Sequence, residues 1–177
     1  MKPPAPISRS RLAALIIIAA AVVGFGTNNL LKNQHRCFEE RFTQSTPEPR
    51  SVELQPFASH TVFVWAVDEE TGFEWADLDA HITLRAADGP LLVARRIAAS
   101  ESGEADGLKR AQNGFTERLT PGPAGITLSI DLENGDYVDI EIYQDLPAWY
   151  HIAPGVYILL GLFGLGLLLK SRQPVAA

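Results

Sequence analysis

Two uncharged and strongly apolar stretches lie near the two ends of the chain. One of them, residues 146–169, contains no Asp, Glu, Lys or Arg. The part from Ile152 onward would form about 27 Å of helix, close to the ~30 Å hydrocarbon thickness of a bilayer. Trp149, Tyr150 and Tyr157 stand at its leading end, and amphipathic rings favour the headgroup region. The pattern predicts a membrane-spanning helix over residues 146–169.

The other apolar stretch, residues 12–31, leaves two alternatives open. Its length suits a second membrane helix, with Asn28 and Asn29 near the outer interface. It also has features of a signal peptide, because basic residues precede an apolar core and Gly24 and Gly26 flank a candidate cleavage site. We favour the uncleaved helix, since such sites prefer alanine to glycine.

Between the two stretches, apolar and polar residues alternate, as they do in strands with one buried face. Turns rich in Gly, Pro, Asn and Asp separate the alternating segments, which is typical of an antiparallel β-sandwich. The segment 61–67, TVFVWAV, is apolar on both faces and is expected at the centre of a sheet. Residues 67–79 and 98–114 are expected to be loops. The seven expected strands are residues 51–55, 61–67, 80–86, 91–97, 115–119, 125–132 and 136–144.

The last two of these strands are expected to form a hairpin. A three-residue loop at 133–135, with Gly135 in the left-handed conformation, would pair Ile130 with Val138 and keep both apolar rows on one face. A two-residue loop at Asn134 and Gly135 would instead place apolar residues opposite acidic ones. The sequence therefore favours the three-residue loop.

The expected fold class is mainly β plus membrane helices: one extracytoplasmic antiparallel β-sandwich of about seven strands flanked by two transmembrane helices. The prolines near residues 47–49 would end any helix that begins near Cys37. The expected parts are a cytoplasmic tail (1–11), the first membrane helix (12–31), a polar connector (32–50), the β domain (51–145), the second membrane helix (146–169) and a second cytoplasmic tail (170–177).

Charge is distributed unevenly along the chain. All 21 acidic residues lie within residues 36–145, between the two apolar stretches, together with nine basic residues, so the net charge of this segment is −12. The rest of the chain carries +6, which gives the chain its net charge of −6. The other six basic residues lie outside it with no acidic residue. Short basic segments stay in the cytoplasm, so we expect both termini inside the cell membrane and the β domain on the periplasmic or extracellular side. An acidic domain repels phosphate backbones, which disfavours a nucleic-acid partner.

Motifs of common enzyme classes are absent from the sequence. It has no G-x-S-x-G, H-E-x-x-H, C-x-x-C, Walker or dinucleotide-binding glycine pattern. Cys37 is the single cysteine and Met1 the single methionine, so no intrachain disulfide forms and a blue-copper ligand set is incomplete. We expect a non-catalytic protein without a cofactor.

A few residues are weak candidates for metal binding. Asp131, Glu133, Asp136 and Asp139 resemble half of a calcium loop, although a solvated hairpin tip explains them equally simply.

The pair His35 and Cys37 has donors for a soft metal, and Cys37 is also a candidate for an intermolecular disulfide or an inert thiol. His60 and His81 are expected to be partly exposed strand residues.

Candidate partner contacts occur in two places. Phe73 and Trp75 are aromatic residues in an acidic loop, where they either form a contact surface or cap the sandwich. Gly155, Gly161 and Gly164 leave a line without side chains, which allows another helix to approach closely. The first candidate for that helix is the other apolar stretch of this chain.

These patterns favour a non-catalytic accessory or assembly subunit of a membrane complex. Its β domain and small-residue helices would contact other membrane protein subunits and membrane lipid. The alternative is an extracytoplasmic ligand- or calcium-sensing module anchored in the membrane.

Overall fold

The computed structural model describes residues 9–71, 76–87, 89–100, 103–105, 108–120 and 122–170. The chain divides into two compact units. One is a β unit that runs from His35 to Leu146, and the other is a helical unit made of the described residues on either side of it. Each end of the β unit therefore continues in sequence into one of the helices.

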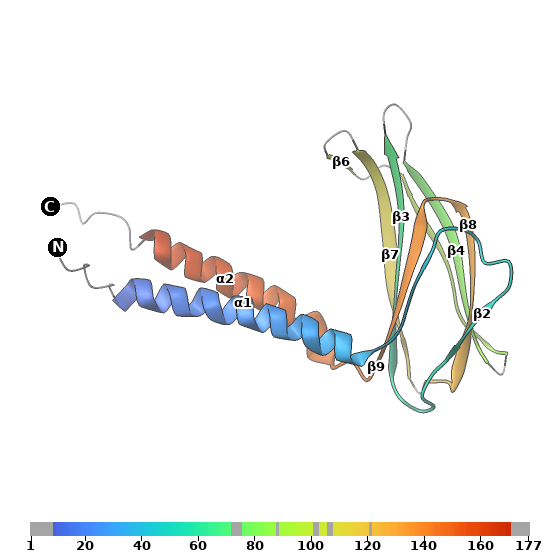
Figure 1. Ribbon diagram of the computed structural model, residues 1–177, viewed down its shortest axis with the longest axis horizontal. Helices are drawn as coiled ribbons and strands as arrows, with labels where there is room; N and C mark the ends of the chain where they lie inside the picture. The colour runs from blue at the N-terminus through green and yellow to red at the C-terminus, as the bar shows by residue number, and fades with distance from the viewer. Residues whose placement is uncertain are drawn as a thin grey trace, which may run out of the picture. The chain divides into compact units, whose positions relative to one another are not determined.

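The β unit consists of two antiparallel sheets that lie face to face (Figure 1). Its described residues form nine strands, so the antiparallel β class expected from the sequence is confirmed, with more strands than expected. The five-stranded sheet has the order β1 (Arg36–Phe42), β9 (Tyr137–Gln144), β3 (His60–Thr71), β7 (Leu108–Leu119) and β6 (Gly103–Ala105). The four-stranded sheet has the order β2 (Arg50–Glu53), β8 (Gly125–Asn134), β4 (Asp77–Ala86) and β5 (Leu91–Ser100).

The core lies between the sheets and is built from the alternating apolar residues. Its fully buried members include Val62, Val64, Ile82, Leu84, Leu128, Ile130, Ile140 and Ile142. Burial of one such side chain stabilises the fold by about 1.5–3 kcal/mol relative to exposure. The strand expected at a sheet centre, β3, is the middle strand of the five-stranded sheet and pairs with both β7 and β9.

The predicted hairpin between the last two strands is wrong. β8 pairs with β2 and β4, whereas β9 pairs with β1 and β3 in the opposite sheet. The chain crosses between the sheets at Gly135, which has φ +133°, and the N–H of Asp136 donates to the carbonyl of Val67 over 2.9 Å. Alternation predicted the buried faces of both strands correctly. It could not distinguish paired strands from facing strands, because both arrangements require the same alternation.

Segments predicted to be loops are largely strands. β1 lies within the predicted connector 32–50, and β6 lies within the predicted loop 98–114. β3 continues to Thr71, β4 begins at Asp77, β5 continues to Ser100 and β7 begins at Leu108. These extensions are polar because they pass beyond the apolar core, and backbone pairing with a neighbouring strand keeps them extended.

Both open edges of the sandwich are bridged by ion pairs between the sheets. On one side Arg50 of β2 lies 3.2 Å from Glu40 of β1, and on the other Arg95 of β5 lies 3.6 Å from Glu117 of β7. Residues that are direct partners in the strand register point to the same face of a sheet. The register partners of these four charged residues are buried in the core, so the charged side chains lie on the core-facing side of the sheets. Inward-pointing charges at sheet edges protect against pairing with other chains.

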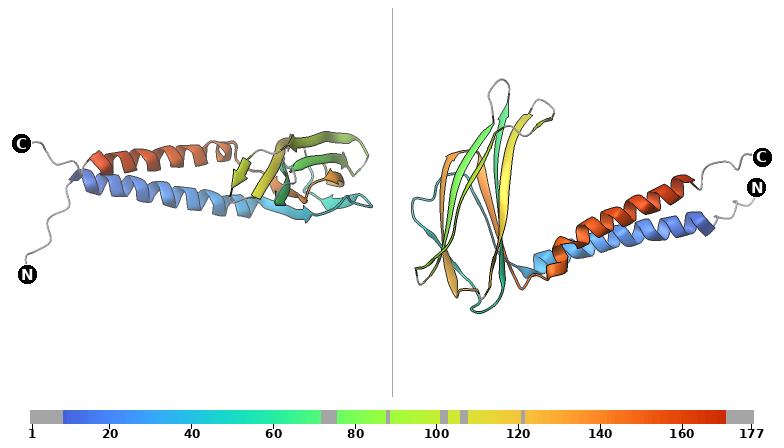
Figure 2. Two further views of the ribbon diagram at one scale, coloured as in Figure 1. Left: turned by 90° about the horizontal axis from the view of Figure 1, so that it is seen from above. Right: turned by 180° about the vertical axis from the view of Figure 1, so that it is seen from behind.

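Two helices of the helical unit are long and apolar enough to cross a membrane. α1 (Arg9–His35) has 27 residues and extends beyond the predicted 12–31 at both ends. α2 (Ala153–Lys170) has 18 residues and follows a short 3₁₀ turn, Ala148–His151, so the predicted span 146–169 begins before the α-helix does. Within this unit the two helices lie side by side (Figure 2).

Small residues form the contact between α1 and α2. Ala14, Ala21 and Asn28 are buried at intervals of seven residues, which places them on one stripe of α1. A Cβ at Gly164 would lie 2.8 Å from Cγ1 of Ile18, and one at Gly161 would lie 3.8 Å from Cβ of Ala21. Among the described residues the amide of Asn28 has no hydrogen-bond partner. Glycine therefore allows the close approach of the helices that the sequence indicated.

Substitution of Gly164 by Leu tests this contact. The new side chain would overlap with Ile18 and with the carbonyl of Ala14, so we expect a loss of about 1–3 kcal/mol in the association of α1 with α2. Cysteines introduced by Ala21→Cys and Gly161→Cys in a Cys37→Ser background report the contact through disulfide formation in membranes. The control is Gly166→Leu, because no atom lies within 4 Å of a Cβ there. Equal crosslinking in both variants would contradict the packing.

Candidate functional site

The outer face of the five-stranded sheet carries a group of aromatic side chains. Trp65 on β3 points outward and is 47% exposed, which is unusual for a large ring in the centre of a sheet. Phe63 lies two residues earlier on the same face, and its ring meets that of Tyr143 on β9 edge to face, with centroids 5.4 Å apart. Aromatic pairs in this geometry are stabilising. The face therefore has an aromatic centre, in which Tyr143 is fully buried and Trp65 is exposed.

Gly114 on β7 makes room for the indole of Trp65. The two residues are direct partners in the strand register, and a Cβ at Gly114 would lie 2.6 Å from Cε3 of Trp65. Glycine within a strand often marks such a close approach. The ring of Trp65 thus lies over β7, and its other side is open to solvent.

A shallow hollow of about 450 Å³ lies beside Trp65. Phe63, Trp65, Gly114, Phe115, Thr116 and Glu141 line it. The carboxylate of Glu141 accepts a hydrogen bond of 2.5 Å from the hydroxyl of Tyr143. The hollow is therefore mostly apolar, with a hydroxyl and a carboxylate at its border.

Charged side chains around this aromatic centre are joined in pairs. Arg41 donates two hydrogen bonds of 2.7 Å to Asp139, and its guanidinium lies 3.8 Å from the ring centre of Tyr137. The hydrogen bond to Asp139 raises the pKa of Arg41 above its ordinary value. Arg110 and Glu69 form another pair at 2.6 Å. An apolar centre with an ion-paired rim is thus the main feature of this surface, which we call the Trp65 face.

The four carboxylates predicted as weak calcium ligands are not brought together. Asp131 and Glu133 lie on β8, whereas Asp139 lies on β9 in the opposite sheet. Asp131 accepts a hydrogen bond from Ser45, and Asp136 accepts one from the N–H of Glu69. Within the described residues, no group of three or more His, Cys, Asp and Glu side chains is arranged to hold a metal ion.

A second hollow, of about 420 Å³, lies on the outer face of the four-stranded sheet and is polar. His81, Asp131 and Glu133 line it together with hydroxyl side chains. Ser45 and Thr46 hydrogen-bond to the backbone of β8, so the lining groups largely bond to one another. His81 is partly exposed, as expected from the sequence.

His35 and Cys37 both contact the backbone of β9. Nδ1 of His35 lies 2.9 Å from the carbonyl of Gln144, and the thiol of Cys37 donates to the carbonyl of Ile142 over 3.3 Å. Burial raises the pKa of the Cys37 thiol, which disfavours the thiolate that soft metals bind.

The prediction that His60 is partly exposed is wrong. Its ring is fully buried at an inward position of β3, and within the described structure neither ring nitrogen has a hydrogen-bond partner. Burial lowers the pKa of His60, and the charge of Asp145 partly opposes this shift. Alternation with Val62 and Val64 was the sequence signal that could have placed His60 inside.

The predicted partner residues have different outcomes. Phe73 and Trp75 lie outside the described residues. Gly161 and Gly164 face α1, as described above, whereas a Cβ at Gly155 would meet no atom within 4 Å.

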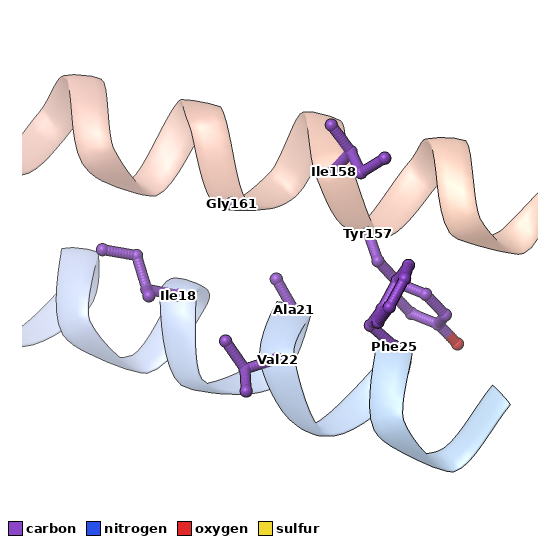
Figure 3. Close-up of a pocket in the computed structure, with 7 residues that line it drawn as sticks. All are labelled: Ile18, Ala21, Val22, Phe25, Tyr157, Ile158 and Gly161. Atoms are coloured by element: carbon purple, nitrogen blue, oxygen red, sulfur yellow. The ribbon is translucent and has the colours of Figure 1, made fainter. Parts of the chain in front are cut away.

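An apolar hollow of about 320 Å³ lies between α1 and α2. Figure 3 shows the rings of Phe25 and Tyr157 together at one end of it, and the methyl group of Ala21 pointing toward α2. The hollow exists because Ala21 and Gly161 are too small to fill the space that the larger residues hold open.

Comparisons with known proteins give no family. No family model matches the sequence, and no curated protein matches it. A solved family GH115 4-O-methyl-α-glucuronidase is 13% identical with a TM-score of 0.36, and the match covers 59% of this chain and 14% of that chain. The sugar-binding C-terminal domain of EclA is 14% identical with a TM-score of 0.33, covering 60% of this chain and 76% of that one. A carbohydrate-binding module of Cellvibrio mixtus lichenase 5A is 12% identical with a TM-score of 0.29, and the match covers 63% of this chain and 93% of that chain. At these values the likeness carries no information about ligand or activity.

The buried ring of His60 predicts how stability depends on pH. The unfolded chain binds a proton at this histidine near pH 6.5, whereas the native chain binds it only at lower pH. Stability should therefore fall as the pH is lowered through about 6.5, by at most ~1.4 kcal/mol per pH unit. In His60→Leu we expect a smaller fall between about pH 7.5 and 5.5, measured by denaturant unfolding of the full chain in detergent.

His81→Ala, which removes an exposed histidine, is the control and should keep the fall. If His60→Leu lost stability with pH as steeply as the natural sequence does, the interpretation of His60 would be wrong.

Proposed function

We propose that this chain is a non-catalytic accessory subunit of a membrane protein complex. α1 and α2 anchor it in the cell membrane with both termini in the cytoplasm, and the β unit is displayed on the periplasmic or extracellular side. The length and apolar character of the two helices support the anchoring. The basic residues near the chain ends and the acidic residues between them support the topology.

The observation that carries the proposal is the Trp65 face. Interfaces between proteins commonly have an apolar aromatic centre that is shielded by a polar rim, and Trp, Tyr and Arg contribute most of the binding energy. Trp65 supplies an exposed ring at the centre of the sheet, and the pair of Arg41 and Asp139 supplies part of the rim. The rim charges already have partners, so a second protein can cover this face without leaving those charges unpaired.

The partner proposed for this face is the extramembrane part of another membrane subunit. A chain held at the membrane meets other anchored proteins at a high effective concentration, because both diffuse in one surface. The exposed apolar side chains of α2, such as Leu159 and Phe163, offer lipid or a neighbouring helix a second contact.

Photo-crosslinking in native membranes tests the proposal. A photoreactive residue in place of Thr116, at the border of the hollow, should capture a protein that has its own membrane span. Trp65→Ala should weaken this capture about 30-fold or more, because loss of a central aromatic residue typically costs ~2 kcal/mol or more. The matched control is His81→Ala, which removes a partly exposed ring from the outer face of the other sheet and should leave capture unchanged.

Two results would contradict the proposal. One is a crosslink to lipid alone, and the other is capture that is equally strong in Trp65→Ala and His81→Ala. The folded state of each variant is checked by the unfolding midpoint of the purified chain.

A further inference from the structure

Three of the four exposed large apolar side chains of the described β unit lie at one of its ends. In the part that the structure describes they are Phe57, Trp65, Leu91 and Leu92. Phe57 is the most exposed of them, at 86%. It lies in the loop between β2 and β3, and the two leucines begin β5. Trp65 alone belongs to the middle of a sheet.

Hydrogen bonds tie the Phe57 loop to the end of the β unit where the chain leaves it. The N–H of Phe57 donates to the carbonyl of Gly122, and that of Gly122 donates to the carbonyl of Ala58. Ser59 and Asp145 bond twice, through the N–H of Asp145 at 2.7 Å and the N–H of Ser59 at 3.0 Å. Asp145 directly precedes Leu146, the last residue of the β unit. Phe57 therefore lies close to this exit point, whatever the tilt of the β unit.

Backbone strain is concentrated at the same end. Phe57 has φ +65° and Asp145 has φ +48°, and they are the two non-glycine residues of the described chain with positive φ. Residues other than glycine rarely adopt a positive φ, and such backbone strain often marks a functional position. The strained backbone at Phe57 leaves its ring exposed on the surface of the β unit. In water such an exposed ring would contribute nothing to the stability of the fold.

Charge differs between the two ends of the β unit. The segments 54–59 and 120–124, which link strands at the Phe57 end, contain no charged residue, although Glu53 precedes the first of them and Asp145 bonds to Ser59 within it. The opposite end, where β3 ends and β4 begins, carries Glu69, Glu70, Asp77 and Asp136. Anionic lipid headgroups repel acidic residues and allow an uncharged apolar loop to enter. The uncharged loops at the Phe57 end are thus better suited to enter a bilayer surface than the acidic turns at the opposite end.

We propose that the Phe57 loop inserts into the headgroup region of the membrane and anchors the β unit to the lipid surface. This inference rests on the membrane anchoring proposed above. Trp149 and Tyr150 follow Leu146 within four residues, and rings of this kind mark the interface of a membrane span. Phe57 adds a ring from a distant part of the sequence, so the β unit contacts the bilayer at one more point than its covalent links provide.

Fluorescence quenching in proteoliposomes tests the insertion. In a Cys37→Ser background, an environment-sensitive dye is attached to Pro56→Cys beside Phe57, to Leu159→Cys in α2, or to Glu133→Cys at the acidic end. The vesicles contain phosphatidylcholine and phosphatidylglycerol, with a spin label near the headgroup or deep in the acyl chain. We expect the headgroup label to quench the dye at position 56, the deep label to quench the dye at 159, and neither to quench the dye at 133.

A second variant isolates the role of the ring. Adding Phe57→Ser to the labelled Pro56→Cys chain should reduce its quenching at least twofold, while the unfolding midpoint shows that the β unit is still folded. If the dye at 159 is quenched and the dye at 56 is not, the insertion is wrong and the membrane anchoring stands. If the dye at 159 is not quenched, the membrane anchoring itself fails.

Discussion

The packing of two apolar rows against each other is the interaction on which the rest of this β unit depends. Val64 and Ile140 from the five-stranded sheet are buried together with Ile82 and Leu128 from the four-stranded sheet. Because side chains alternate along a strand, filling the interior fixes which residues point outward. Burial of Val64 thus forces Trp65 to the outer face. The outward direction of Trp65 is therefore a consequence of core packing.

Alternation also explains how far the sequence predicts the fold. It identified seven strands and, for β8 and β9, the buried face, and the run of apolar residues around Trp65 placed β3 at the centre of its sheet. It missed β1, because Phe38 and Phe42 are four residues apart and this spacing suits a helix as well as a strand. Alternation could not predict which strands pair, since pairing depends on contacts between residues distant in sequence. For β8 and β9 it therefore led to the wrong prediction of a hairpin, although the chain crosses from one sheet to the other between them.

The candidate site was harder to predict than the fold for the same reason. Trp65 was visible in the sequence only as part of an apolar run. The room for its ring depends on Gly114, which lies opposite it through a pairing that local sequence does not encode. The acidic residues near Asp136 gave a stronger local signal for a site, yet pairing distributes them over two sheets. In the helices, two of the three predicted glycines, Gly161 and Gly164, face α1, whereas Gly155 does not.

Connectivity gives the pairing of β1 with β9 a mechanical consequence. α1 continues directly into β1, and β9 leads through a short turn to α2, so each helix is attached to one of two neighbouring strands. Arg36 and Tyr143 form the first register pair next to both attachment points. A force that draws the two helices apart would load this pair first and open the ladder one hydrogen bond at a time. Unzipping of this kind requires less force than shearing all bonds at once. Separation of the helices would therefore detach the edge strand, β1, first.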